Sequence, residues 1–410
     1  MRNIYTSVDI GTDTIKVIVS ELYNGKLNLL ASSSTKSKGI KKGMIIDMDE
    51  ALTSLKMAIS EVEAKLNIKI HNIIAVIPSY SSEYKLIKGS INIKDIVTKE
   101  DIIEVLNNGV KIDEVNMEML TIIPINFSID GTVIKEPLGK MGSTLESKAI
   151  LATTPKRNIY TIMKLFEKCE LEVQDISNTG ISDMAALKSN DFLGKVGVIV
   201  NIGSDITTIS LYNKSIIIKD SILEIGGKTI DNDISYIYKT SMYEAKKVKE
   251  RFAIASIKHA STNDIYDLIS ENGKVVKVTQ REVSQIVVAR LEEILKSIKR
   301  GIQDLTDRQI DYIIFTGGVS NMPYLDSLIE YVFGSTANVA KINIVGMRNN
   351  KYTSSLGSIV YYINKQKLVG EITGMLSDED IDNLTSYKKN ILSVSNESML
   401  GKVASYFFGE

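Results

Sequence analysis

Two short stretches with similar sequences contain residue types that bind phosphate. The first, DIGTDTIKVIV, covers residues 9–19, and the second, NIGSDITTISLY, covers residues 201–212. Each combines an acid or amide, a glycine, a hydroxyl and an aspartate, followed by β-branched residues. A tight glycine turn exposes backbone N–H groups that converge on an anion, and the hydroxyls of Thr12 and Ser204 add donors. Two such turns facing each other across a cleft would hold the β- and γ-phosphates of a nucleotide.

Charged residues beside the first turn, and a third glycine segment, extend this hypothesis. Asp9 can hold a hydrated Mg²⁺, which prefers oxygen ligands, and Lys16 can reach a phosphate as a point charge. The third segment, IIFTGGVSNMPYLDSLIEYVF at 313–333, indicates a strand, a glycine turn and a helix. There Gly317 and Gly318 would let the backbone approach a base or ribose closely. Each segment alone also fits an ordinary structural turn, so the argument depends on finding all three.

Strands and helices alternate along the chain in a way that would position these turns. Apolar runs at 4–20 and 27–34 with Asn-Gly between them predict a hairpin. Residues 48–66 place apolar side chains on one helical stripe, with Asp47 as N-cap. Further helices are expected at 98–107, 241–252 and 281–301. Because each copy of the turn opens with hairpins, the self-similarity predicts two like α/β domains with mixed sheets.

The composition excludes several classes of protein. The chain has 410 residues, more than one typical domain, and a formal net charge of −1. No overall field attracts nucleic acid, so no nucleic-acid partner is expected. One cysteine and two distant histidines argue against a disulfide framework and a zinc site. Neither a secretion signal nor a transmembrane helix is expected from the apolar runs.

The order DIGT, NIGS, FTGG resembles the actin superfamily and, within it, the FtsA family of bacterial cell-division proteins. Four more stretches carry the resemblance: SKGIKKGMIIDMDEALTSLKMAISEVE (37–63), EMLTIIPINFSIDG with KEPLGKMGSTLESKAIL (118–151), EIGGKTIDNDIS (224–235) and YTSSLGSIVYY (352–362). The resemblance implies an α/β actin-like fold, with duplicated ribonuclease-H-like domains and a nucleotide cleft between them. It also implies a subdomain of the FtsA type, called 1C.

The resemblance further implies a domain division, cofactors and site residues. The first actin-like domain (1A) would comprise 1–81 and 156–192, with 1C inserted at 82–155. The second (2A) would comprise 193–225 and 305–375, with a smaller subdomain (2B) at 226–304. A flexible linker is expected at 376–397. The cofactors would be ATP and Mg²⁺, the latter at Asp9. The implied nucleotide-binding residues are Asp9, Gly11, Thr12, Thr14, Lys16, Asn201, Gly203, Ser204, Gly227, Lys249, Gly317 and Gly318.

Several positions depart from the family pattern. The second phosphate motif usually reads DIGGGTT, so Asn201 replaces the acid that positions magnesium and water, and Ser204 and Asp205 replace glycines. Asp205 would bring like charge to a phosphate. Asp231 stands where the family usually has Thr, and Lys246 where an acid is usual. Hydrolysis needs an oriented water and metal. We therefore expect no more than a slow ATPase, with no catalytic residue assigned, and a degenerate cleft retained for packing is the alternative.

The last segment, SMLGKVASYFFGE at 398–410, has an amphipathic pattern. Its apolar residues recur at helical spacing and would share one face: Met399, Leu400, Val403, Phe407 and Phe408. A short amphipathic helix can lie in the headgroup interface. From composition alone, packing onto its own domain or a partner fits equally well. The FtsA family has an amphipathic membrane anchor here, so the resemblance implies binding to cytoplasmic-membrane lipid.

The resemblance also implies partners. The C-terminal peptide of the tubulin-like division protein FtsZ would bind the 2B subdomain at SQIVVARLEEILKSIKRGIQDL, 284–305, an apolar stripe edged by Lys296, Lys299 and Arg300. The expected function is an ATP-binding protein that forms actin-like filaments and tethers FtsZ to the inner face of the cytoplasmic membrane at the division septum. The alternatives are a PilM-like pilus-assembly ATP-binding protein and an actin-fold phosphotransferase.

Overall fold

The first of two similar sheets contains the DIGT turn. A computed structural model of the chain describes residues 3–342, 344, 346–377 and 379–384. The first sheet has the strand order β11-β6-β1-β2-β3, in which β1, β2 and β3 are antiparallel neighbours and β6 and β11 run parallel to β1. Its strands are β1 (Asn3–Ile10), β2 (Thr14–Tyr23), β3 (Lys26–Lys36), β6 (Asn72–Ile77) and β11 (Glu172–Asn178).

The second sheet repeats this topology strand for strand and contains the NIGS turn. Its order is β14-β13-β12-β17-β18, again with three antiparallel neighbours followed by two parallel strands. The strands are β12 (Val196–Ile202), β13 (Thr207–Asn213), β14 (Ile216–Leu223), β17 (Tyr312–Thr316) and β18 (Ala337–Val339). The predicted duplication is therefore confirmed, and each glycine turn joins the first two strands of its sheet.

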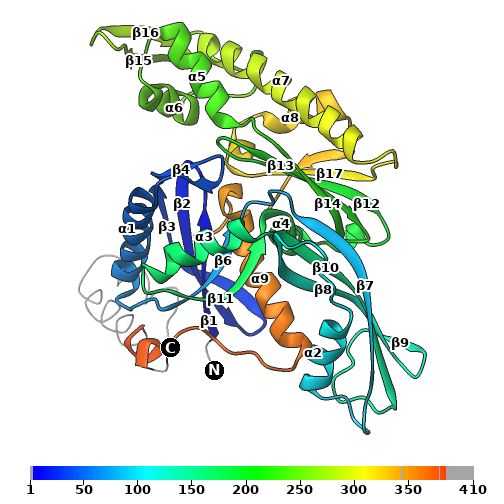
Figure 1. The fold of residues 1–410 in the computed structure, drawn as a ribbon. Helices are drawn as coiled ribbons and strands as arrows, with labels where there is room; N and C mark the ends of the chain where they lie inside the picture. Colours follow the sequence, from blue (N-terminus) through cyan, green and yellow to red (C-terminus); the bar gives the residue numbers. More distant parts are fainter. Residues whose placement is uncertain (1–2, 343, 345, 378, 385–410) are drawn as a thin grey trace, which may run out of the picture.

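Helices cover both sheets, and α4 (Thr179–Leu187) and α9 (Thr353–Leu368) lie between the sheets (Figure 1). α1 (Met48–Leu66) begins at Asp47, whose side chain accepts hydrogen bonds from the backbone N–H groups of Asp49 and Glu50. The other helices of the two sheets are α3 (Lys156–Glu167) and α8 (Leu325–Phe333). α4 and α9 cross so closely that a Cβ on Gly357 would lie 1.7 Å from the Ser182 carbonyl oxygen.

An inserted unit lies between β6 and β11 in the sequence and extends from the side of the first sheet (Figure 1). It is a four-stranded antiparallel sheet, of order β7-β10-β8-β9, covered by one helix. A separate small core, which includes Phe127 and Leu145, lies beneath that helix. The elements are β7 (Glu83–Asn92), α2 (Lys99–Asn108), β8 (Met117–Ile129), β9 (Thr132–Ile134) and β10 (Thr144–Pro155).

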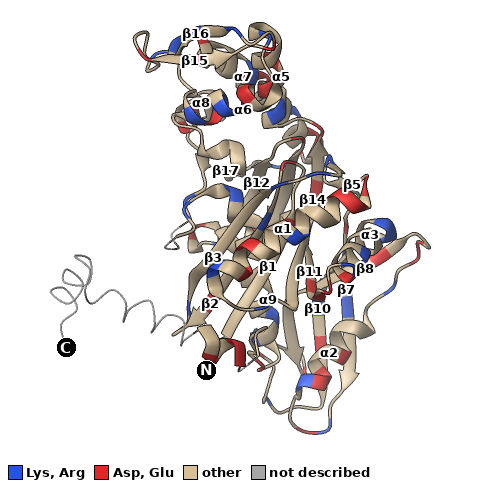
Figure 2. Ribbon diagram, turned by 90° about the vertical axis from the view of Figure 1, so that its left-hand side faces the viewer, with Lys and Arg blue, Asp and Glu red and all other residues tan. Residues whose placement is uncertain are grey.

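A second unit projects from the second sheet, at the top of Figure 1. It contains α5 (Gly227–Tyr238), α6 (Met242–Arg251), β15 (Ile265–Ile269), β16 (Val275–Thr279) and α7 (Gln280–Leu305). The remaining short elements are β4 (Ile40–Lys41), β5 (Met44–Ile45) and the 3₁₀ turns Asn190–Phe192, Gly318–Asn321 and Asn350–Tyr352. Figure 2 shows basic and acidic residues mixed over the described chain.

The central strand of the second sheet is buried on both faces, and this holds the NIGS turn rigidly. Val198 and Val200 pack into the core of the second half, whereas Ile199 packs into the core that includes β1 and α1. Alternate residues of a strand point to opposite faces, so β12 joins the two cores. The carboxyl end of β12, where the turn begins, is thereby fixed relative to β1.

The segment that follows α9 packs against the first half for part of its length. Residues 379–384 are helical, and Leu384 is buried in the first core. The start of the range predicted as a flexible linker is therefore packed rather than free. In the described part of the chain, no helix combines the length and apolar character needed to cross a membrane.

Candidate functional site

A cleft of about 590 Å³ lies between the two glycine turns and the segment after β17. Pockets of roughly 300–1,000 Å³ are typical of small-molecule sites. The cleft brings together all of the predicted nucleotide-binding residues except Gly227: its lining includes Asp9, Gly11, Thr12, Thr14, Lys16, Asn201, Gly203, Ser204, Lys249, Gly317 and Gly318. Segments about 190 residues apart in sequence, brought together by the duplication, therefore form one site.

The two turns are built in the same way. A Cβ on Gly11 would lie 2.6 Å from the carbonyl oxygen of Thr14, and a Cβ on Gly203 would lie 2.9 Å from that of Ile206. The Gly203 N–H also donates to the Ile206 carbonyl at 3.0 Å. Both glycines are therefore required by lack of space, which explains why the residue recurs in both copies.

Donors and charges at the first turn fit an anion accompanied by a cation. The Thr12 hydroxyl oxygen accepts a hydrogen bond from the Gly43 N–H at 2.7 Å, so its own hydrogen remains available to donate. The Lys16 ammonium lies 2.7 Å from the Asp9 carboxylate, and both side chains are mostly buried. A magnesium nucleotide carries both signs of charge, so it can contact both members of this ion pair.

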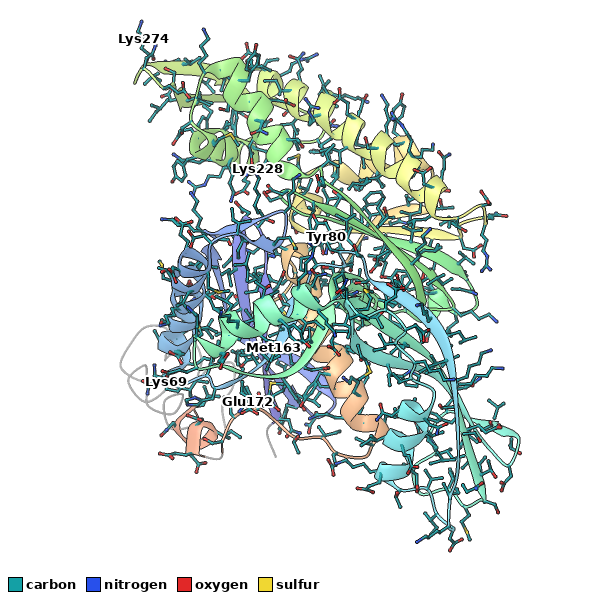
Figure 3. All side chains as sticks on the ribbon, viewed as in Figure 1. Lys69, Tyr80, Met163, Glu172, Lys228 and Lys274 are labelled. Carbon is teal, nitrogen blue, oxygen red and sulfur yellow. The ribbon has the colours of Figure 1, made fainter. Side chains whose placement is uncertain are left out.

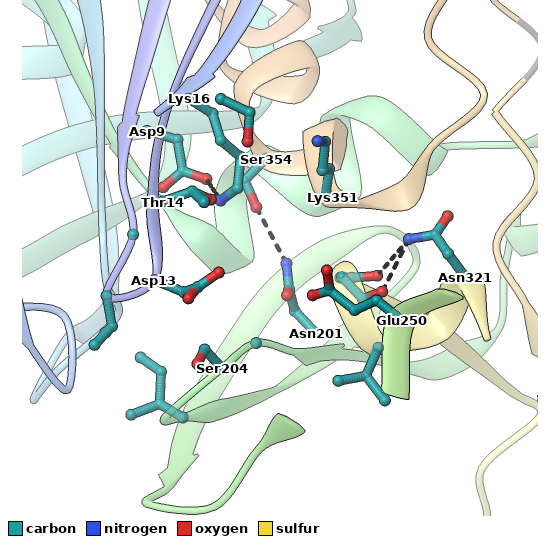
Figure 4. Close-up of a pocket in the computed structure, with 18 of the residues that line it drawn as sticks. Asp9, Asp13, Thr14, Lys16, Asn201, Ser204, Glu250, Asn321, Lys351 and Ser354 are labelled. Atoms are coloured by element: carbon teal, nitrogen blue, oxygen red, sulfur yellow. Dashed lines mark hydrogen bonds and ion pairs between the residues drawn. The ribbon is translucent and has the colours of Figure 1, made fainter. Parts of the chain in front are cut away.

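The glycines after β17 line the other end of the cleft, together with Asn321, which Figure 4 labels. Gly317 has φ +91°, and a Cβ there would lie 2.5 Å from Asn201 Oδ1, so only glycine fits. A Cβ on Gly318 would meet no atom within 4 Å. The Asn321 amide donates to the carbonyls of Gly317 and Gly318, which holds the turn. Gly318 therefore borders open space that a planar base can occupy.

The residues present fit a nucleotide, and they are compatible with its magnesium ion. Among the described residues, no three or more His, Cys, Asp or Glu side chains cluster as a metal site. Magnesium bound to a nucleotide takes most of its ligands from phosphate and water, with one or two carboxylates. Asp9, which lines the cleft, is the residue that would hold this ion, whose charge would offset that of the phosphates.

A buried carboxylate that the sequence did not reveal lies behind Asn201. The Asn201 amide donates to Asp183 at 2.8 Å and to Ser354 at 3.1 Å, and the Ser354 hydroxyl donates to Asp183 at 2.7 Å. Burial raises the pKa of Asp183 to about 7, although the hydrogen bonds from Ser354 and Asn201 oppose this shift. The signal in the sequence is Asp183 itself, which is the one charged residue in the helix TGISDMAAL.

Lys249 lines the cleft but is already paired. Its ammonium lies 2.7 Å from Asp231, with side chains 8% and 6% exposed, and it donates to the Gly227 carbonyl at 3.0 Å. Burial raises the pKa of Asp231, and the charge of Lys249 opposes this shift only in part. Gly227 lies behind the cleft, where its N–H donates to the Gly203 carbonyl at 2.9 Å and ties α5 to the second turn.

The two other departures from the family pattern form ion pairs with neighbouring elements. Lys246 on α6 pairs with Asp13 of the first turn at 2.5 Å, across the cleft. Asp205 does not line the cleft: its carboxylate lies 3.5 Å from Lys228 and accepts from the Lys42 N–H at 3.4 Å. Lys228, labelled in Figure 3, follows the start of α5. The prediction that Asp205 faces a phosphate is therefore wrong, because these partners turn it away.

The structure corrects one part of the surface predicted to bind the FtsZ peptide, namely the apolar stripe of α7. Lys296 and Arg300 are exposed, and Lys296 lies 3.6 Å from Glu292 on the same helix. The apolar stripe of α7, including Leu291 and Ile294, is buried in the core of the second half. The stripe itself is therefore not a docking surface, although its charged edge is accessible. The predicted membrane-binding residues lie outside the described residues: Met399, Leu400, Val403, Phe407 and Phe408.

Two sheets of one topology that enclose a cleft between matched glycine turns define an actin-like protein. Among solved structures, the chain is similar to the PilM–PilN type IV pilus biogenesis complex (TM-score 0.60, 12% identity, 87% of this chain and 98% of that chain). It is also similar to MreB5 of Spiroplasma citri bound to ADP (TM-score 0.56, 12% identity, 90% of this chain and 99% of that chain). At these identities the likeness establishes the fold alone.

Sequence comparisons identify the family. The model for cell division protein FtsA matches residues 198–357. The model for the SHS2 domain inserted in FtsA matches 81–153, which covers the four-stranded insertion except for the last two residues of β10. Cell division protein FtsA of Streptococcus pneumoniae serotype 2 (strain D39 / NCTC 7466) is 30% identical over 381 residues, 90% of this chain and 80% of that protein. FtsA of Bacillus subtilis (strain 168) is 27% identical over 388 residues, 92% and 88% of the two chains. The chain belongs to the FtsA family, and its role is an FtsA-like role in cell division.

Proposed function

We propose that this chain binds ATP with magnesium in the cleft, assembles into actin-like filaments and tethers FtsZ to the inner face of the cytoplasmic membrane at the division septum. The observation that carries the nucleotide part is the meeting of both glycine turns and the glycines after β17 in one cleft. Converging backbone N–H groups suit phosphates, and the space beside Gly318 suits a base. The MreB5 structures, which contain ADP and AMPPNP, support this proposal because they show nucleotides bound to proteins of the same fold.

We further propose that the cleft hydrolyses ATP slowly or not at all. Asn201 is neutral, and its amide nitrogen already donates hydrogen bonds to the Asp183 carboxylate and the Ser354 hydroxyl. Loss of one electrostatic contact at a reacting centre lowers rates by roughly 10²–10³. We therefore assign the nucleotide a role in subunit contacts, through its contacts with both halves of the molecule, rather than a role as a substrate that turns over.

The tethering part rests on two separate regions of the chain. The apolar spacing of 398–410 suits a helix that lies in the headgroup interface, and filament assembly would present many such segments at once. For the FtsZ peptide, α7 carries the exposed Lys296 and Arg300, and it contacts α8 through Lys299, which donates to the Val332 carbonyl at 2.9 Å. Tyr331 on α8 is 81% exposed. A peptide with apolar and acidic residues would find both kinds of partner there.

The tethering function is tested by liposome co-sedimentation of purified FtsZ. The full chain should bring FtsZ down with vesicles of anionic and neutral phospholipid, and a chain ending at Ser395 should not. Phe407→Ala with Phe408→Ala should lose sedimentation, whereas the matched change Ser398→Ala with Ser405→Ala on the polar side should keep it. Equal sedimentation by the full and shortened chains would contradict the membrane role.

The peptide surface is tested by titrating the FtsZ C-terminal peptide into the full chain. Lys296→Glu with Arg300→Glu should weaken binding by about tenfold, because two attractive charges become repulsive. Lys277→Glu, an exposed lysine on β16 of the same unit, is the control and should change little. Unchanged affinity in the double variant would remove α7 from the proposed site.

A further inference from the structure

The Asp183 carboxylate joins three elements immediately behind the cleft. Asp183 lies on α4 and is 1% exposed; one of its oxygens accepts from Asn201 on β12 and the other from Ser354 on α9. Both donors line the cleft, whereas Asp183 itself lies one layer deeper. Any charge on Asp183 therefore acts on the cleft through two groups that face it.

This buried acid lacks a cation. In the described part of the chain, no Lys, Arg or His forms an ion pair with Asp183, and the charges that face it, Asp9 on β1 and Asp220 on β14, are also acidic. Lys16, the nearest basic group to Asp9, is already paired with Asp9. A buried carboxylate without a cation is costly. The cation that would balance it can come from a ligand in the adjoining cleft.

The acid also fixes the orientation of Asn201. Because the Asn201 amide nitrogen donates to Asp183 and Ser354, its oxygen points the other way, and Figure 4 shows the nitrogen directed at Ser354. That oxygen lies at the Gly317 end of the cleft. An aspartate at 201 would instead put two carboxylates near 2.8 Å apart, where both cannot ionise. The side chains at 183 and 201 therefore act as one unit with a single charge.

We propose that Asp183 is a positioning residue of the nucleotide site, which supplies from α4 the negative charge that Asn201 lacks and orients the Asn201 amide toward a magnesium-bearing nucleotide. This inference rests on the proposed binding of ATP. It follows that aspartate at 201 alone should not tighten nucleotide binding, because Asp183 already supplies a negative charge beside that position.

The test is the affinity for ATP, measured by calorimetry on the full chain with magnesium and with a chelator. Asp183→Asn and the smaller Asp183→Ser should each weaken magnesium-ATP binding by about tenfold. When a chelator removes magnesium, their affinity for ATP should differ little from that of wild type. The exchange Asp183→Ser with Asn201→Asp should restore the magnesium-dependent affinity, which a merely structural role does not predict. Asp220→Asn is the control, since Asp220 also has a buried carboxylate oxygen but hydrogen-bonds Tyr84, away from the cleft lining.

The outcomes separate this inference from the function on which it rests. If the wild-type chain binds magnesium-ATP and both Asp183 variants bind it equally well, the positioning role is wrong and nucleotide binding stands. If Asp220→Asn produces the same loss, the effect belongs to buried charge in general, and the role of Asp183 is overturned. If the wild-type chain binds no ATP with or without magnesium, the proposed nucleotide function fails, and the inference fails with it.

Discussion

The buried ion pair between Lys249 and Asp231 gives a prediction whose size follows from the structure. At 2.7 Å and an effective dielectric constant of 20, the attraction is about 6 kcal/mol. Desolvation of two side chains that are 8% and 6% exposed offsets much of it. Asp231→Asn removes one charge and leaves the Lys249 ammonium buried, with the Gly227 carbonyl as an acceptor. We expect a loss of about 3 kcal/mol in the free energy of unfolding.

The assay is thermal unfolding followed by circular dichroism, since the chain has no tryptophan to serve as a fluorescence probe. A loss of about 3 kcal/mol corresponds to roughly 6–12 °C for a unit of 150–250 residues. Asp231→Asn with Lys249→Met should return to within about 1 kcal/mol of wild type, because no charge is then buried alone. Lys85→Met, which breaks exposed pairs with Glu83 and Glu114, should cost less than about 1 kcal/mol. A single variant as stable as wild type, or a double variant no better than the single one, would refute the reasoning.

Three further predictions concern other parts of the molecule. Gly357→Ala should lower stability by about 3 kcal/mol or more in urea unfolding, because its Cβ would lie 1.7 Å from the Ser182 carbonyl oxygen. Burial raises the pKa of Asp183 to about 7 from an ordinary value near 3.9, so its contribution to stability is lost as pH rises between about 4 and 7; Asp183→Asn should flatten that dependence by up to about 4 kcal/mol. Burial also raises the pKa of the Cys169 thiol to about 11, so iodoacetamide should alkylate it more slowly than a free cysteine; faster alkylation would contradict that environment.

Local features of the fold were predictable because short-range chemistry determines them. The turn at Asn24 and Gly25 has positive φ at both residues, as a two-residue hairpin requires. α1 runs from Met48 to Leu66 behind its Asp47 cap, as the apolar stripe indicated. The duplication was visible because both turns need glycine for the same steric reason.

What the sequence left hidden depends on contacts between distant segments. A periodic stripe shows that one face of α7 is apolar but not whether another element covers it, and the core of the second half does cover it. The direction in which the Asp205 side chain points depends on Lys42, which is distant in sequence, and on Lys228, which lies on α5. The position of Asp183 behind Asn201 follows from the close packing of α4 against α9, which no local pattern encodes.

The binding of ATP in the cleft is the central claim, and calorimetric titration of the full chain with magnesium-ATP tests it most directly. Wild type should bind one ATP weakly. Gly318→Leu should abolish binding without lowering the unfolding temperature, because its side chain would fill space that no other atom occupies. Gly318→Ala, which adds a single methyl group, should retain more affinity than Gly318→Leu. Absence of binding by wild type at saturating ATP, or equal binding by wild type and Gly318→Leu, would contradict the account.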